Sequence, residues 1–139
     1  MISFEVTNII LNAAMIEEKL KKAEIRGLKR IGFLTRQASQ QSIRDGAGAS
    51  APGTPPHSHT GTLRRFILYS LSDDKKSVVI GPKYLKKKSK DAAKATEYGG
   101  RAVNSRSVPI RVQPRPFMHP ALAKVSRENV PGVFGNSFR

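Results

Sequence analysis

The N-terminal third of the chain carries a helical pattern of apolar residues. Apolar side chains recur every three or four positions from Ile9 to Ala38, and this spacing predicts a helix that ends near Arg44. A helix of about 36 residues is about 54 Å long, which is too long for a small domain to cover over its whole length. Before it, residues 1–6 alternate apolar and polar side chains, a period of two that predicts a short strand half buried on one face.

The middle of the chain predicts an extended loop followed by a hairpin. Residues 46–61 contain Gly, Ala, Ser, Thr, Pro and His but no large apolar side chain, so we expect a flexible loop. Residues 62–71 are apolar enough for a strand, with a helix as the alternative for their first turn. Asp73 and Asp74 then form a turn, and residues 77–80 form a second strand that stops at Gly81-Pro82.

A basic segment and a third strand follow the hairpin. Residues 83–94 contain six lysines and lead into a short helical turn that ends on Gly99-Gly100. Residues 101–107 are typical of a loop. Residues 108–112 alternate apolar and polar side chains, which predicts a third strand of the same sheet. We expect it at the sheet edge, because Pro109 has no N–H to donate to a neighbouring strand.

The last residues predict a helix and an arm. Residues 117–129 form the helix, with Pro120 tolerated in its first turn, and Pro131 and Gly132 end it. The arm that remains is loose or docks on another surface. Together the elements predict one α+β domain with a small antiparallel sheet. Its parts are a strand and long N-terminal helix (1–45), a flexible extended loop (46–61), the sheet and C-terminal helix (62–130) and a C-terminal arm (131–139).

Length and composition narrow the class of protein. A chain of 139 residues is long enough for one domain. Its apolar content of 38% is below the usual range, so we expect a thin core that neighbouring subunits supplement. The absence of cysteine excludes a disulfide framework, a zinc ribbon and a cysteine nucleophile. No apolar run approaches the ~18 residues of a membrane span, and no signal peptide is evident, so we expect a soluble protein without a membrane partner.

Positive charge is the strongest compositional signal. The formal net charge is +15, and residues 83–139 contribute +10 of it. Such a balance favours an acidic protein or nucleic acid as partner, against the simpler interpretation of a solvated basic loop. Aromatic residues near the lysines are scarce, only Tyr84 and Tyr98, so readout of single-stranded bases is disfavoured.

Candidate catalytic and metal-binding residues do not form a set. His57 and His59 lie in the Pro- and Gly-containing loop, with His119 remote from them in sequence, and a zinc site needs three or four placed ligands. We therefore favour solvated loop histidines. Asp73 and Asp74 are adjacent turn residues rather than a facing pair of carboxylates. We expect no catalysis, no cofactor and no metal.

Five short segments, taken in order and spacing, resemble a known family. In chain order they are Pro55-Pro56, residues 60–65 (TGTLRR), Val78–Pro82 (VVIGP), residues 97–100 (EYGG) and residues 115–122 (RPFMHPAL). Together with a long preceding helix, they are similar to the small neck or tail-completion proteins of long-tailed bacteriophages. That family includes proteins described as head–tail joining, tail component and minor tail protein Z. The lysine-rich stretch and the Phe-containing tail depart from the family pattern.

The resemblance implies a structural virion protein that assembles as a ring at the head–tail junction or at the upper end of the tail, after synthesis in the host cytoplasm. Its partners would be copies of itself and other neck and tail proteins (head-closure, tail-terminator or tail-tube proteins), with contact to passing genomic DNA secondary. The alternative is a small basic protein with non-specific affinity for duplex DNA. Candidate interface residues are Arg64, Arg65, Lys86, Lys87, Lys88, Glu97, Tyr98, Phe134 and Phe138. Candidate structural residues are Gly61, Leu63, Gly81, Pro82, Gly99, Gly100, Arg115, Pro116, Phe117, Pro120 and Leu122, of which Phe117 and Leu122 would anchor the C-terminal helix on the core.

Overall fold

The fold is α+β, built around one long helix. The computed structural model describes residues 2–83, 92–104 and 106–135, with side chains in the first helix described from Ala14 onward. In chain order the elements are α1 (Ile2–Ser42), β1 (Arg44–Asp45), β2 (His57–Ser58), α2 (Thr62–Arg65), β3 (Ile67–Leu71), β4 (Val78–Pro82), α3 (Ala92–Tyr98), β5 (Gly100–Val103), β6 (Pro109–Val112), α4 (Met118–Glu128) and α5 (Val130–Gly135).

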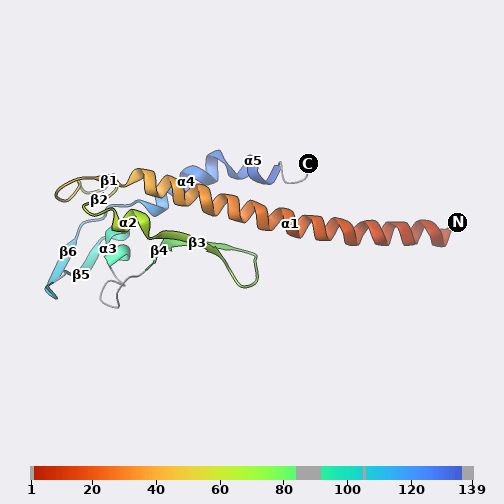
Figure 1. Cartoon of the computed structure of the whole chain (residues 1–139), viewed down its shortest axis with the longest axis horizontal. Helices are drawn as coiled ribbons and strands as arrows, with labels where there is room; N and C mark the ends of the chain where they lie inside the picture. Colours follow the sequence, from red (N-terminus) through yellow and green to blue (C-terminus); the bar gives the residue numbers. More distant parts are fainter. Residues whose placement is uncertain (1, 84–91, 105, 136–139) are drawn as a thin grey trace.

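The long helix is the axis of the molecule. Helices α4 and α5 lie on one side of α1 and the β3–β4 hairpin on the other, while the N-terminal part of α1 extends beyond the body (Figure 1). The predicted strand over residues 1–6 is wrong, because α1 begins at Ile2. A helix pairs its backbone groups within the segment, whereas a strand at this end would need a partner strand to pair with.

The β3–β4 hairpin is confirmed, and it packs closely on α1. The strands are antiparallel, with Tyr69 opposite Ile80. Gly32 of α1 allows the close approach, since a Cβ there would lie 2.6 Å from the Tyr69 ring and 2.8 Å from a Val78 methyl. The second strand ends at Gly81-Pro82 as predicted, but it includes these two residues rather than stopping at residue 80, and Pro82 pairs with Ile67.

The predicted third strand forms, but in a different sheet. β6 pairs antiparallel with β5, which lies where a loop was predicted over residues 101–107, and the described residues contain three separate two-stranded sheets. The chain enters β5 through Gly99 and Gly100, whose φ values of +75° and +128° favour glycine as expected. β5 follows α3 directly, and β6 pairs with β5 rather than with β3 or β4.

The 46–61 loop is tied to the body rather than unstructured throughout. His57 and Ser58 form β2, which pairs in parallel with β1, so the prediction of a loop is wrong at these two residues. Farther along the loop, the Gly53 N–H donates to the Pro114 carbonyl over 2.8 Å. The Arg115 guanidinium Nε donates to the Ser50 carbonyl, also over 2.8 Å. Contacts within the chain therefore hold this loop in place.

The core is small and lies where α1, the hairpin and α4 meet. Ile43, Ile67 and Phe117 are each at most 1% exposed. Leu63, Ile80 and Met118 pack around them, half buried. Phe117 is thus the anchor that the sequence predicted. Leu63 reaches the core from α2, the helical alternative for the start of residues 62–71, and not from a strand.

The C-terminal elements differ from the prediction in two respects. Helix α4 forms with Pro120 in its first turn, but Leu122 is 43% exposed and does not anchor it; Ala121 and Val125 face the body instead. Residues 130–135 are not a loose arm but the short helix α5, in which Pro131 occupies the first turn. Phe134 of α5 packs over Gly27 of α1, where a Cβ would lie 2.6 Å from the ring. Helix α5 docks because Gly27 leaves room for that ring.

Candidate partner-binding surfaces

A cleft of about 720 Å³ lies beside α2 and contains both arginines that the sequence proposed for partner contact. The chain enters α2 through Gly61, whose φ of +69° favours glycine. This turn places Arg64 and Arg65 side by side at the cleft. The full lining comprises Arg36, Gln40, Asp45, His59, Thr60, Gly61, Arg64 and Arg65.

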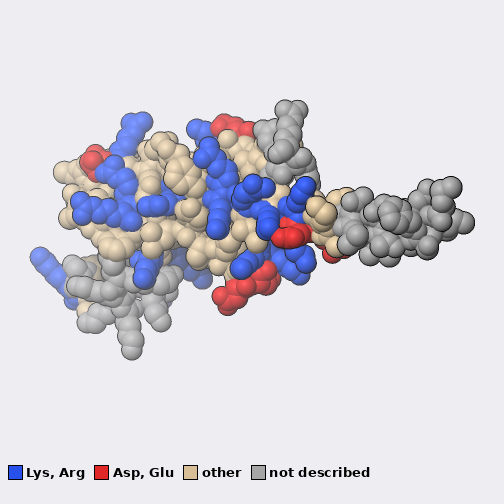
Figure 2. Space-filling view, turned by 45° about the vertical axis from the view of Figure 1, so that its right-hand side comes forward, with Lys and Arg blue, Asp and Glu red and all other residues tan. Residues whose placement is uncertain are grey.

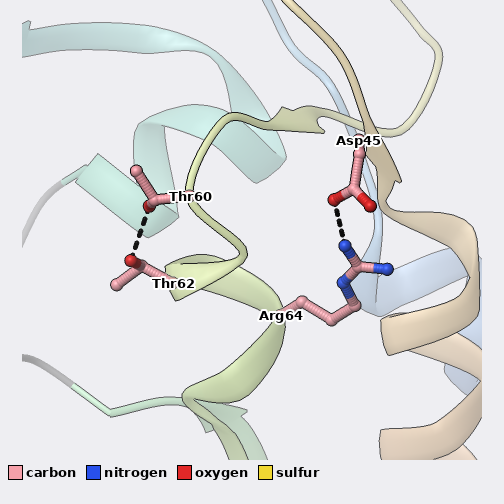
Figure 3. Close-up of polar contacts among 4 residues, drawn as sticks. All are labelled: Asp45, Thr60, Thr62 and Arg64. Carbon is pink, nitrogen blue, oxygen red and sulfur yellow. Dashed lines mark hydrogen bonds and ion pairs between the residues drawn. The ribbon is translucent and has the colours of Figure 1, made fainter.

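The polar groups of the cleft are partly used within the chain. Arg64 forms an ion pair with Asp45, and the Thr60 and Thr62 hydroxyls lie 2.6 Å apart (Figure 3). The Arg36 Nε donates to the Ile67 carbonyl over 3.0 Å. In contrast, Arg65 is exposed and has no ion-pair partner among the residues that the structure describes. Arg65 is therefore the cation of this cleft that is available to a partner.

The β5–β6 hairpin is a second basic surface. Arg101 and Arg111 are paired directly across the two strands, and both are exposed. Like charges in directly opposed positions repel each other. No acidic residue occurs between Glu97 and Glu128 to offset them, and neither arginine forms an ion pair within the described part of the chain. An external anion would stabilise this pair.

Apolar side chains accompany these arginines. Val103 is 53% exposed, Val108 51% and Ile110 41%. The Asn104 side-chain oxygen accepts hydrogen bonds from the N–H groups of Arg106 and Val108, over 2.9 and 3.0 Å, and so orders the turn of the hairpin. Because side chains alternate between the two faces of a strand, Val103 lies on the face of Arg101 and Arg111, whereas Ile110 lies with Ala102 on the other face. The arginine face thus presents Val103 beside two guanidinium groups, a combination common at protein interfaces.

The projecting part of α1 is a third exposed surface. The N-terminal part of α1 extends beyond the body (Figure 1), and among its described side chains Met15 is 57% exposed and Ile16 is 56% exposed. Next to them, the Lys22 ammonium lies 2.6 Å from the Glu18 carboxylate. The hydrogen bond and charge of Lys22 lower the pKa of Glu18 below its usual value.

The face of the molecule shown in Figure 2 is basic. Lys and Arg side chains cover much of the body there, while acidic side chains occur mainly at its margins and near the point where α1 leaves it (Figure 2).

One predicted interface residue is used inside the chain. Glu97 is 7% exposed, and its carboxylate accepts hydrogen bonds from three backbone N–H groups at the start of α4. These donors belong to Phe117 (2.9 Å), Met118 (3.0 Å) and His119 (2.7 Å). The carboxylate caps a helix 20 residues later in the chain, so within this subunit it is not on the surface.

The other predicted interface residues are spread over the molecule. Tyr98 is 71% exposed beside the buried Glu97. Phe134 is half buried against α1 of its own chain. Lys86, Lys87, Lys88 and Phe138 lie outside the described residues. The sequence reasoning did not single out Arg101, Arg111, Met15 or Ile16. The absence of acidic residues from 98 to 127 was the signal that could have found the two arginines.

The histidines do not come together. His57 lies in β2, His59 borders the cleft at α2 and His119 is exposed on α4. Within the described ranges, no group of three or more His, Asp or Glu side chains is arranged to hold a metal ion. In the same ranges, none of the helices is both long enough and apolar enough to pass through a membrane.

Comparison with protein-family models, with curated proteins and with solved structures yields no match to this chain.

Proposed function

We propose that this chain is a structural subunit of a tailed-phage virion, which joins head and tail or completes the tail as part of a ring and performs no catalysis. The proposal starts from the five segments that resemble neck and tail-completion proteins. Its partners are further copies of itself and neighbouring neck and tail proteins, at the head–tail junction or the upper tail of a particle assembled in the host cytoplasm.

The observation that carries the proposal is the set of large apolar side chains exposed on the described part of the chain, among them Met15, Ile16, Val79 and Val103, each more than half exposed. Subunits of permanent assemblies bury such side chains against neighbours. A monomeric protein with so small a core has no evident use for them.

The distribution of exposed apolar groups supports the same proposal. Met15 and Ile16 lie on α1, and Val103, Val108 and Ile110 lie in the β5–β6 hairpin and its turn, so the exposed apolar side chains occur in separate parts of the chain. Contact with neighbouring copies would remove these side chains from water, at about 25 cal/mol for each Å² of apolar surface buried. The thin core of Ile43, Ile67 and Phe117 would then be supplemented across subunit boundaries.

The test is the state of association of the purified chain. We expect sedimentation velocity and native mass spectrometry to give a closed oligomer of one size, and negative-stain electron microscopy to show rings. A chain that remains monomeric at high micromolar concentration, together with the absence of a corresponding ring from purified particles or tails, would contradict the proposal.

A second candidate function is non-specific binding of duplex DNA. The free Arg65 at the cleft and the formal charge of +15 favour it. In a salt titration on duplex DNA, binding that neutralises several phosphates weakens with a slope of about 0.9 per phosphate, and Arg65→Glu should lower that slope by about 1. The exposed Arg127 of α4 supplies the matched control, Arg127→Glu. Weak binding that does not depend on salt would remove this candidate.

A further inference from the structure

We propose that neighbouring copies contact head to tail, with the β5–β6 hairpin of one copy seated on the projecting part of α1 of the next. The contact rests on the ring-forming function proposed above and specifies which surfaces meet. It follows from two exposed surfaces of complementary chemistry in separate parts of one chain.

The first surface is the exposed part of an apolar stripe that runs along one side of α1 and faces the core farther along the helix. Residues at spacings of four, three, four and four lie on one side of a helix with 3.6 residues per turn. Here they are Ile16, Leu20, Ala23, Gly27 and Ile31. Toward the body the stripe is covered, since Ile31 is 7% exposed and Ala23 is 3% exposed. Farther toward the N-terminus, Ile16 of the same stripe is 56% exposed.

Two carboxylates flank this stripe. Glu17 and Glu24 are seven residues apart, two turns along the helix, and therefore lie on the same side of it. Both are exposed, and neither forms an ion pair within the described part of the chain, unlike Glu18, which pairs with Lys22. The uncovered stripe thus carries an apolar strip with two unpaired negative charges beside it.

The second surface is the β5–β6 hairpin, with the opposite charge. Its opposed Arg101 and Arg111 form no ion pair within the described residues, and Val103, two residues after Arg101 and therefore on the same face, is exposed beside them. A shallow depression of about 520 Å³ lies along the hairpin between Arg101 and Ile110. Carboxylates placed near the two guanidinium groups would offset their mutual repulsion.

A second copy of this chain is the partner that would both cover the apolar residues and pair the charges of the two surfaces. Ile16 and Leu20 would cover Val103, while the two carboxylates meet the two arginines on the same face of the hairpin. Duplex DNA would match the arginines but leave the apolar stripe of α1 uncovered. Pairing of two α1 helices would bury the stripe but leave the hairpin arginines without an anion.

The position of the two surfaces sets the kind of assembly. The N-terminal end of α1 and the β5–β6 hairpin lie at opposite ends of the long axis (Figure 1). A contact between different patches of identical subunits is heterologous, and it generates a ring when the rotation from copy to copy closes. The same contact repeated around the ring uses both ends of every subunit.

Charge reversal tests the contact. The first variant is Arg101→Glu with Arg111→Glu, and the second is Glu17→Arg with Glu24→Arg. Each should weaken assembly in sedimentation velocity by at least about tenfold, because like charges then face each other. The chain with all four substitutions should assemble again, and so should a mixture of the two defective variants. The matched control, Lys124→Glu with Arg127→Glu on α4, changes the net charge as much as the first variant and should assemble normally.

Disulfide trapping provides a measurement that does not depend on charge. The chain has no cysteine, so Ile16→Cys with Val103→Cys introduces the only two thiols. Mild oxidation should give a ladder of covalent oligomers from this double variant and none from either single variant. A covalent dimer from Ile16→Cys alone would indicate pairing of two α1 helices and overturn the proposal.

The remaining outcomes separate this contact from the proposed function. If the wild-type chain assembles and both charge-reversed variants assemble equally well, the ring stands and the head-to-tail contact is wrong. If the arginine variant loses duplex DNA binding but still assembles, the hairpin contacts nucleic acid and the contact is again wrong. A monomeric wild-type chain would overturn the ring itself.

Discussion

Replacing Glu97 by alanine tests the contact that joins α3 to α4. The first N–H groups of a helix have no partner within the helix. In α4 no side chain of the helix itself caps them; the Glu97 carboxylate does so, with acceptor distances of 2.7 to 3.0 Å. Its negative charge also lies at the positive end of the helix dipole. Glu97→Ala removes the charge and all three hydrogen bonds at once.

The cost follows from the burial of the donors. Losing an N-cap side chain costs about 0.5–2 kcal/mol, and a hydrogen bond to a charged group contributes about 1.5–3 kcal/mol. The N–H of Phe117 belongs to a residue that is 1% exposed, so water cannot replace the carboxylate there. His119 is exposed, and water can hydrate its N–H. We therefore expect Glu97→Ala to lower the free energy of unfolding by about 2–4 kcal/mol, and Glu97→Gln, which keeps one acceptor oxygen, by about half as much.

Urea unfolding followed by circular dichroism measures this loss, with all variants at one protein concentration because association contributes to stability. Glu128 is the matched control. It is exposed at the last residue of α4, the negative end of the dipole, so Glu128→Ala should leave stability unchanged or raise it by about 0.3–1 kcal/mol. A loss below about 0.5 kcal/mol for Glu97→Ala, the range of ordinary surface substitutions, would refute the capping role.

Four further predictions concern the core, the hairpin and the lysine segment. Phe117→Ala should cost about 3–5 kcal/mol in the same urea assay, because the ring is 1% exposed, and an unchanged midpoint would contradict its role. Gly32→Ala should lower the melting temperature in calorimetry, since the added Cβ meets two strand side chains at 2.6 and 2.8 Å and this overpacking outweighs the gain in helix propensity. The pKa of Asp74 is lowered by hydrogen bonds from the Ser72 hydroxyl and the Lys76 N–H, so the stability that its carboxylate adds to the turn is complete above about pH 4 and is lost as the pH falls further. Asp74→Asn should therefore reduce the acid dependence of unfolding; an unchanged dependence would contradict this. Glutamate at all three positions 86–88 should block joining of particles in a complementation assay while the circular dichroism spectrum stays native, and normal assembly would contradict the proposed partner contact.

Local sequence patterns were sufficient to predict an element when that element buries one side, since its apolar residues then recur at a regular spacing. The three- and four-residue spacing on α1 reports a buried stripe, and the turn residues between β3 and β4 report a hairpin, whatever these elements pack against. Phe117 and Gly99 were also predictable, since a large apolar residue at a helix start and a glycine after a helical turn each have a local physical reason. These features define the α+β class.

Contacts between distant segments were not predictable from such patterns. Glu97 and the N-terminus of α4 are 20 residues apart, and Phe134 meets Gly27 more than 100 residues away along the chain. The alternation in β6 predicts a strand, but its pairing partner depends on which other strand lies beside it in the folded chain. That strand is β5, which follows α3. A sequence pattern specifies which side of an element is apolar, because that depends on local geometry alone. Which partner covers that side, and which stretch of α1 is left uncovered, is decided only by the packing of the whole chain.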